Sequence, residues 1–289
     1  MSQMTAVIII YNKEVEKSIT YNRLSKVKGV EVLIIDNSEE ETDNAAFCRK
    51  NSVSYISMKG NKGLSKAYNV AVEWCIDKQK DIIILFDDDT YVPTEYFDIL
   101  SEYLYKCFDA EIFVPVIYGQ DGRIYSPNRG RFLKNSLIGS TTEQIPQVKF
   151  NAISSCMAIR MSVFDGYRFN ELLFVDQVDF VFCHDQRKRG KTFIRLPVSV
   201  QQRFHQREQN IASQAGWKRL QIRIIDIMKS AVLIGGKRFL IVGYVKGCLL
   251  GVQMARRTKD VSILFKAIKL STYWFAYLLK RPAISGGNE

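Results

Sequence analysis

Three consecutive aspartates, Asp87, Asp88 and Asp89, follow directly on an apolar run and are the strongest candidates for chemistry in this sequence. Adjacent carboxylates repel one another, and without a cation their mutual field raises a carboxyl pKa or loosens the turn. Mg²⁺ and Mn²⁺ bind oxygen ligands of this kind, usually carboxylates together with phosphates and water. A solvated acidic turn or a helix cap is the alternative, but the position after a buried strand favours a metal-binding role.

Two other polar sites could contact a ligand. Asp36 follows the apolar run Val30–Ile35, where its carboxylate could accept a hydrogen bond from a nucleobase or a ribose hydroxyl, or could cap a turn. A glycine-bearing loop between Gly60 and Asn69 opens a helical stretch, and free backbone N–H groups at such a start suit an anionic ligand. Its spacing is neither that of a P-loop nor that of a dinucleotide-binding loop, and Gly63 could simply begin the helix.

The elements that must position these residues alternate between strand-like and helical patterns. Short β-branched runs, suited to strands buried on both faces of a sheet, occur at Thr5–Ile10, Val30–Ile35, Val53–Ser57, Asp81–Phe86 and Glu111–Val116. Helical stretches lie between them at Lys13–Val27, Gly63–Lys78 and Thr94–Cys107. This alternation predicts an α/β fold with a mainly parallel sheet, which binds ligands beyond the carboxyl ends of its strands.

The remaining chain is less regular. From Ile117 to about Phe150 it is rich in Gly, Asn, Ser and Arg, which predicts loops over a binding cleft. Strand-like character returns at Val148–Arg160 and Thr192–Phe204, a helix is predicted for Asp176–Arg189, and the chain beyond Ile211 looks helical.

The order and spacing of the acidic and glycine motifs resemble the large inverting, family-2-type glycosyltransferases with the GT-A fold, over about residues 4 to 205. The likeness is greatest to the bacterial branch that includes rhamnosyl- and galactofuranosyltransferases. The resemblance implies a nucleotide-diphosphate sugar donor, dTDP- or UDP-linked, and a saccharide or lipid-linked saccharide acceptor in cell-surface polysaccharide synthesis. It assigns donor binding to Asp36, Asn61, Gly63, Asn69, Asp87 and Asp88, and a bridging Mn²⁺ or Mg²⁺ to Asp89.

The same resemblance gives roles to two carboxylates further along. Asp179 matches the family's base, and an inverting transfer needs a carboxylate that takes the proton of the attacking hydroxyl. Asp176 would hold the acceptor, since an i, i+3 spacing on the predicted helix puts both on one face, or would only cap that helix. The chain departs from the family pattern at Val181, Phe182 and Asp185, where Glu, Trp and Arg are expected.

Only two histidines occur, His184 and His205. His205 follows the predicted strand Thr192–Phe204 and matches a family histidine that completes the metal shell beside Asp89; the alternative is a structural role. Six cysteines without a CxxC pair indicate a reducing compartment, and the N-terminus lacks the features of a signal peptide, so we expect a cytoplasmic protein.

The net charge of +11 is carried by the C-terminal part. Residues 1–204 hold 26 basic and 26 acidic side chains, whereas residues 205–289 hold 15 basic and 4 acidic ones. We therefore predict a GT-A catalytic domain at 1–210, with a nucleotide-sugar half to about 110 and an acceptor-side half at 111–210, and a basic amphipathic helical tail at 211–289.

The tail has two apolar stretches, Ala231–Gly251 and Val261–Leu279, close to the roughly 20 residues of a membrane span. Lysines and arginines interrupt both, and each costs about 2.5–3.5 kcal/mol at the bilayer centre. The pattern favours helices at the interface with anionic lipid, on the inner face of the cell membrane. The alternative is that the apolar faces pack on the catalytic domain or form a homo-oligomer contact.

Two other function classes compete. A basic interaction module without catalysis, gripping nucleic acid or a membrane, fits the charge of the tail. The neutral first part and the lack of any nucleic-acid motif disfavour nucleic acid, and we expect no such partner. A phosphatase of the DxDx[TV] type would need Thr or Val at position 91, which is Tyr91 here.

Overall fold

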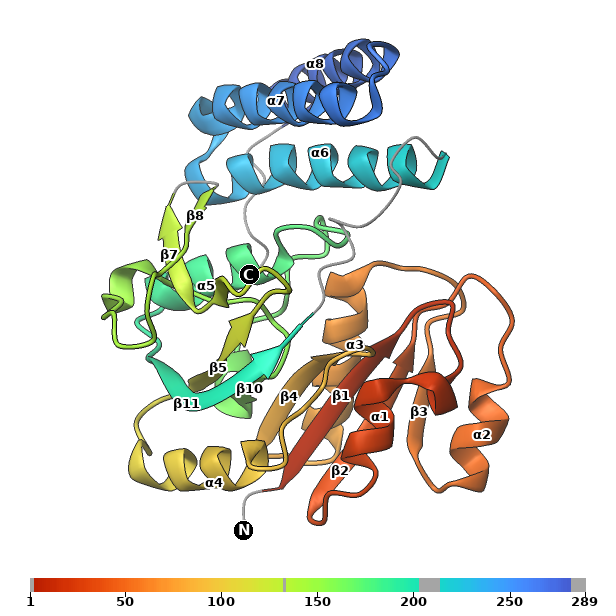
Figure 1. The fold of residues 1–289 in the computed structure, drawn as a ribbon, viewed down its shortest axis with the longest axis vertical. Helices are drawn as coiled ribbons and strands as arrows, with labels where there is room; N and C mark the ends of the chain where they lie inside the picture. The colour runs from red at the N-terminus through yellow and green to blue at the C-terminus, as the bar shows by residue number, and fades with distance from the viewer. Residues whose placement is uncertain (1–2, 132–133, 203–213, 282–289) are drawn as a thin grey trace. The chain divides into compact units, whose positions relative to one another are not determined.

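The computed structural model describes residues 3–131, 134–202 and 214–281, and the chain divides into two compact units (Figure 1). The sheet unit comprises Met1–Phe169 and Cys183–Arg203. The helical unit comprises Asn170–Phe182 and Phe204–Glu289. The segment Asn170–Phe182, which includes the first residues of helix α5 (Val178–Lys188), thus groups with the C-terminal helices. The sequence patterns did not indicate this grouping.

The sheet unit is built on one eight-stranded sheet in the order β11-β5-β10-β4-β1-β2-β3, with β6 paired to β5. The strands are β1 (Met4–Ile10), β2 (Val30–Asp36), β3 (Ser54–Ser57), β4 (Ile82–Asp87), β5 (Ile112–Tyr118), β6 (Ile124–Ser126), β10 (Met157–Arg160) and β11 (Phe193–Gln201). β1 pairs in parallel with β2 and β4, β2 with β3, and β5 with β11. β10 and β6 pair antiparallel with their neighbours. The mainly parallel α/β sheet predicted from the sequence is confirmed.

Burial explains the central strands. The apolar run Ile82–Phe86 of β4 has no exposed side chain, as expected for a strand covered on both faces. The covering helices of the sheet unit are α1 (Ile19–Leu24), α2 (Asn44–Lys50), α3 (Leu64–Asp77) and α4 (Tyr96–Lys106), and α5 (Val178–Lys188) begins in the helical unit and ends in the sheet unit. Short 3₁₀ turns lie at Val15–Lys17, Gln147–Lys149 and Met161–Phe164.

The structure differs from the sequence prediction in three places. The helix predicted at Lys13–Val27 is a 3₁₀ turn followed by α1, because Ser18 is extended and its hydroxyl accepts from Tyr21 N as an N-cap. Helix α2 was missed, since seven residues are too few for a clear helical period. The region predicted as loops contains β6 and, with β9 (Phe150–Asn151), a small sheet of β7 (Asn128–Arg131) and β8 (Lys134–Ser136) in the order β8-β7-β9.

The helical unit packs α6 (Gln214–Gly235), α7 (Leu240–Thr258) and α8 (Ser262–Lys280) against one another, with a 3₁₀ turn at Lys237–Phe239. Its core includes Leu220, Ile224, Met228, Leu240, Ile263 and Leu278. The apolar faces of the tail helices are therefore partly used within the tail itself. By length and composition alone, one helix of the described residues, Lys237–Thr258, could cross a membrane, although a buried helix of a soluble protein can pass the same test.

Candidate active site

The sheet register brings two of the predicted acidic sites to one edge. Ile10 at the end of β1 pairs with Asp36 at the end of β2. On the other side of β1, Ile9 pairs with Asp87 at the end of β4. The two carboxylates therefore flank the carboxyl end of β1, the edge at which parallel α/β sheets bind their ligands.

The acidic turn after β4 brings three consecutive carboxylates together. Burial, together with the charges of Asp89 and Asp88, raises the pKa of Asp87 to about 6, although the hydrogen bonds from Gln202 and Ser155 act to lower it. Gln202 donates to Asp87 Oδ2 at 2.7 Å. Asp88 forms an ion pair with Lys13, with 2.8 Å between Lys13 Nζ and Asp88 Oδ2. The arrangement would be relieved by a cation, a proton or both.

The backbone of this turn is held by hydroxyl groups at the start of α1. Ser18 Oγ donates to the carbonyl of Asp88 at 2.7 Å, and Thr20 Oγ1 accepts from Thr90 N at 2.9 Å. Thr90 Oγ1 lies 3.0 Å from Ser155 Oγ on the far side. Sequence reasoning missed these hydroxyls and Gln202. The N-cap pattern at Ser18 was the one available signal, and it says nothing about the partner 70 residues away.

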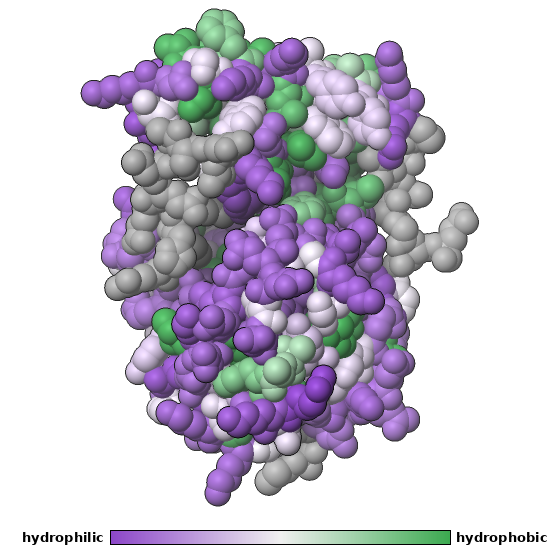
Figure 2. Space-filling model, turned by 90° about the vertical axis from the view of Figure 1, so that its right-hand side faces the viewer, coloured by the Kyte–Doolittle hydropathy of each residue, from purple (hydrophilic) through white to green (hydrophobic). Residues whose placement is uncertain are grey.

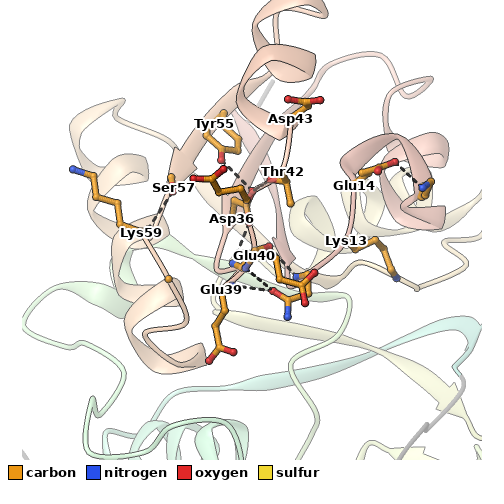
Figure 3. Close-up of a pocket in the computed structure, with 15 residues that line it drawn as sticks. Lys13, Glu14, Asp36, Glu39, Glu40, Thr42, Asp43, Tyr55, Ser57 and Lys59 are labelled. Carbon is orange, nitrogen blue, oxygen red and sulfur yellow. Dashed lines mark hydrogen bonds and ion pairs between the residues drawn. The ribbon is translucent and has the colours of Figure 1, made fainter.

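Asp36 organises a pocket beside the acidic turn. Its side chain is only 3 % exposed, and it accepts from Ser38 N (3.1 Å), Thr42 Oγ1 (3.1 Å), Asn44 Nδ2 (2.8 Å) and Tyr55 OH (3.0 Å). Figure 3 shows Thr42 and Tyr55 directed at this carboxylate. Burial acts to raise the pKa of Asp36, but these hydrogen bonds outweigh it and hold the pKa below its ordinary value.

The pocket itself has a volume of about 850 Å³ and lies entirely within the sheet unit. Its lining is strongly charged, because it includes Lys13, Lys17 and Lys59 as well as the acidic residues Glu14, Asp36, Glu39, Glu40, Glu41 and Asp43, most of which are labelled in Figure 3. A cavity of this size can hold a nucleotide. Because both oxygens of Asp36 already accept internal hydrogen bonds, its first role in this structure is to shape the pocket wall.

The predicted donor loop leads into α3. Asn61 Oδ1 accepts from Asn37 Nδ2 (3.0 Å) and from Gly63 N (3.1 Å). Gly63 has a φ of 90°, which favours glycine, and it is the N-cap of α3. Asn69 is buried and pairs with the backbone of Phe169, accepting from its N–H at 2.8 Å and donating to its carbonyl at 3.0 Å. Asn61 and Gly63 thus lie near Asn37 beside the pocket, whereas Asn69 ties α3 to a distant loop.

The predicted metal site is only partly described. His205 lies outside the described residues. Within residues 3–131, 134–202 and 214–281, no group of three or more His, Cys, Asp and Glu side chains is placed to hold a metal ion. The chemistry of the acidic turn does fit a cation, because the pKa of Asp87 is raised and because Gln202 Oε1 is buried without a partner among the described residues.

The two acceptor-side carboxylates lie in the helical unit. α5 begins at Val178, so Asp179 is in its first turn and Asp176 precedes it. The predicted common helical face of Asp176 and Asp179 is therefore wrong, because Gln177 between them has a left-handed φ of 67° and breaks the helix. Asp176 forms an ion pair with Arg219 of α6.

Two further titratable groups, His184 and Cys156, are poor candidates for chemistry. Burial, together with the charges of the neighbouring Lys188 and Arg187, lowers the pKa of His184 to about 4, so the ring is neutral at pH 7. Burial raises the pKa of the Cys156 thiol well above its ordinary value, which leaves no thiolate for nucleophilic attack.

The sequence of the chain matches a family of known proteins. The profile of Glycosyl transferase family 2 matches residues 5–168. A dTDP-rhamnosyl transferase of Shigella flexneri, RfbF, is 30% identical over 186 residues, which cover 63% of this chain and 62% of that protein. The low-salt glycan biosynthesis hexosyltransferase Agl10 of Haloferax volcanii is 25% identical over 200 residues, 66% of this chain and 63% of that protein. Both matches thus span less than two thirds of the relatives' length.

Among solved structures, residues 1–349 of S. aureus TarS align with a TM-score of 0.54 over 94% of this chain and 92% of that one, at 14% identity. At that identity the likeness concerns the fold alone. It extends over the C-terminal helices as well as the sheet unit.

Proposed function

The chain belongs to glycosyl transferase family 2, and we propose that it transfers a sugar, with inversion, from a dTDP- or UDP-linked donor to a saccharide or lipid-linked saccharide in cell-surface polysaccharide synthesis. The observation that carries the proposal is the placement of Asp36 and the Asp87–Asp89 turn on either side of β1, beside a nucleotide-sized pocket. Rhamnose is the preferred donor sugar in this proposal, because the rhamnosyl transferase RfbF is among the relatives; galactofuranose is the alternative.

In this proposal the pocket behind Asp36 receives the nucleoside. The lysines on its wall, Lys13 and Lys59, suit a donor diphosphate. Asp36 holds Tyr55 and Thr42 in place as the floor. Asp87 and Asp88 contact the ribose or the sugar, and Asn61, Gly63 and Asn69 form or brace the loop beside them.

Asp179 acts as the general base. As the acceptor oxygen attacks the anomeric carbon, its proton passes to the Asp179 carboxylate, a new C–O bond forms, and the bond from that carbon to the diphosphate oxygen breaks. The bonding electrons leave with the nucleoside diphosphate, and attack from the opposite side inverts the anomeric centre. Asp176, next to the base, would orient the acceptor.

A divalent cation, Mn²⁺ or Mg²⁺, would be held by Asp89 with His205, and it would supply charge neutralisation to the departing diphosphate. The raised pKa of Asp87 and the unpartnered oxygen of Gln202, among the described residues, support a cation at this turn. Substitution of either proposed ligand should weaken the metal dependence of the activity while the protein stays folded.

The experiment is a screen of nucleotide sugars for transfer or hydrolysis with Mn²⁺, Mg²⁺ or chelator, in wild type, Asp179→Asn and Asp89→Asn. We expect Asp179→Asn to lower turnover by about 10²–10⁴-fold with donor KM unchanged. Asp89→Asn should abolish the metal-dependent rate. The matched control is Asp77→Asn, an exposed carboxylate at the end of α3, which should behave as wild type. Wild-type turnover in Asp179→Asn would refute its role as base.

For the helical unit we propose docking on the anionic, cytoplasmic face of the cell membrane. The face of α7 turned away from the helical core exposes Ile241, Val245 and Leu249, which are 54%, 49% and 55% exposed. Exposed basic residues stand at both ends of the helix, at Lys237 and Arg238 before it and at Arg256 and Arg257 in its last turn. Figure 2 shows hydrophobic residues among hydrophilic ones over these helices. An apolar strip with cations at its ends fits a lipid interface.

A further inference from the structure

Asp226 is a fully buried carboxylate on α6, in a helix whose other charged residues are all basic. It accepts hydrogen bonds from three consecutive backbone N–H groups of the segment before α5. The distances are 3.0 and 3.1 Å from Phe174 N, 2.8 Å from Val175 N and 2.9 Å from Asp176 N. An ionised carboxylate is expensive to bury unless donors surround it, and these amides meet that need.

Two basic residues of α6 bind the same segment. Lys229 Nζ donates to the carbonyl of Leu172 at 2.7 Å and also lies 5.1 Å from the ring centre of Trp274 on α8. Arg219 forms an ion pair with the carboxylate of Asp176. On α6, the side chains of Arg219, Asp226 and Lys229 share one face. The opposite face carries Leu220, Ile224 and Met228, which pack into the helical core. One face of α6 thus builds the unit, and the other binds the segment 172–176.

The geometry of that segment decides where α5 begins. Asp176 N is fixed on Asp226, Gln177 turns the chain through a left-handed φ of 67°, and Asp179 follows in the first turn of α5. A left-handed φ is uncommon for a residue other than glycine and is maintained only where neighbouring contacts hold it. The contact of Asp226 with Asp176 N holds the residue directly before this turn, and the carbonyl of Gln177 itself accepts from Val181 N within α5.

We infer that Asp226, assisted by Lys229, is a positioning residue for sugar transfer: it fixes the segment that sets the place and direction of Asp179. The inference rests on the proposed role of Asp179 as base. It makes the C-terminal helices part of the catalytic machinery as well as a docking unit. Sequence reasoning missed Asp226, although a single aspartate within the otherwise apolar stretch Ile224–Met228 was a visible signal.

The test measures amide exchange and kinetics on the full chain. Asp226→Asn keeps the size of the side chain but removes the negative charge that the three backbone N–H groups bind. The new N–H₂ donor opposes Phe174 N if it takes the place of Oδ1, and all three N–H groups if it takes the place of Oδ2. We expect hydrogen–deuterium exchange in peptides covering 172–180 to be about tenfold faster. The kcat should fall on the order of 10²-fold, the cost of a small misplacement of a catalytic group, with the donor KM unchanged. Asp260→Asn makes the same change at an exposed site of the same unit and is the control.

Lys229→Met provides a second variant, which keeps an unbranched apolar chain but loses the ammonium group that lies over Trp274 and donates to Leu172, and it should show a smaller effect of the same kind. Unchanged exchange in both variants overturns the inference, as does faster exchange with unchanged kcat. An equal loss of donor affinity also overturns it, because the effect would then reach beyond the segment. If wild type transfers no sugar from any donor while exchange changes as expected, the proposed function fails and the binding of the segment by α6 stands.

Discussion

At the scale of single residues, the site contains a buried carboxylate whose negative charge lowers the stability of the folded state. Asp87 is the clearest case, because burial and the neighbouring Asp89 and Asp88 raise its pKa from the ordinary 3.8 to about 6. In the folded protein at pH 7 this carboxyl is ionised, although its burial and the neighbouring carboxylates disfavour the negative charge. Such a group makes the folded state less stable than it would be with a neutral side chain, which is common where function rather than stability selects the residue.

We predict that Asp87→Asn raises the melting temperature at pH 7 while abolishing transfer. The folded state binds this proton more tightly than the unfolded state, so the residue's contribution to stability falls as pH rises from about 4 to about 6 and stays low above it. The difference from wild type should therefore be largest at pH 7 and vanish near pH 4. A gain of 1 kcal/mol corresponds to about 2–4 °C in a chain of this size.

Calorimetry of both proteins at pH 4 and pH 7, with and without Mn²⁺, checks this, with Asp77→Asn as the exposed control. Added Mn²⁺ should stabilise wild type more than the variant, because a bound cation relieves the same repulsion. A variant that melts below wild type at pH 7 would show that the hydrogen bond from Gln202 outweighs the charge.

At the scale of elements, the helical unit depends on close approach of α7 to its neighbours. Gly243, Gly247 and Gly251 recur every fourth residue and are buried on the inner face of α7. A methyl group on Gly251 would lie 2.5 Å from Ala267 Cβ on α8, and one on Gly247 would lie 2.6 Å from Ser271 Oγ. These glycines let the helix axes come closer than side chains would allow.

We predict that Gly251→Ala destabilises the protein. Alanine favours an isolated helix over glycine by roughly 0.5–1 kcal/mol, but overpacking a tight contact costs about 1–3 kcal/mol, and the methyl of Ala267 has no rotamer to escape into. Urea unfolding should show the net loss. The decisive control is Gly251→Ala with Ala267→Gly, which moves the methyl group from α8 to α7 and should recover most of the stability. A single variant as stable as wild type would contradict the packing account.

At the scale of the whole molecule, charge is divided between the two parts of the chain. The first 204 residues are neutral, and the excess of +11 falls in the remainder. The same part presents the exposed strip Ile241, Val245 and Leu249. A unit that carries both the proposed docking surface and the proposed base would suit an acceptor anchored in the lipid.

We predict that the protein floats with anionic vesicles at low salt and not with neutral ones, because basic residues near the surface contribute about 1 kcal/mol each and are screened by salt. Val245→Glu with Leu249→Glu should reduce binding strongly. Gln253→Glu, which adds one negative charge instead of two at an exposed position of the same helix, should reduce it only slightly. The opposite outcome is that wild type does not bind vesicles but forms a dimer, and that the Val245 and Leu249 changes abolish the dimer. That result would assign the strip to a homo-oligomer contact.

The sequence by itself determined the parallel α/β sheet, the family and the edge at which the acidic motifs meet. β-branched runs such as Ile82–Phe86 specify buried strands through local periodicity, and motifs directly after such runs must lie at the carboxyl ends of the strands. The concentration of basic charge in the tail was equally visible, because composition needs no coordinates.

Only the tertiary structure decided which groups surround the proposed catalytic carboxylates. Gln202 reaches Asp87 across 115 residues, Asp36 is saturated by Thr42, Asn44 and Tyr55, and Asp226 binds the amides of the segment before Asp179. The physical reason is that every residue except proline offers a backbone N–H and many offer a hydroxyl or an amide. Which of them meets a given carboxylate depends on how helices and strands pack, and local sequence carries almost no record of that choice.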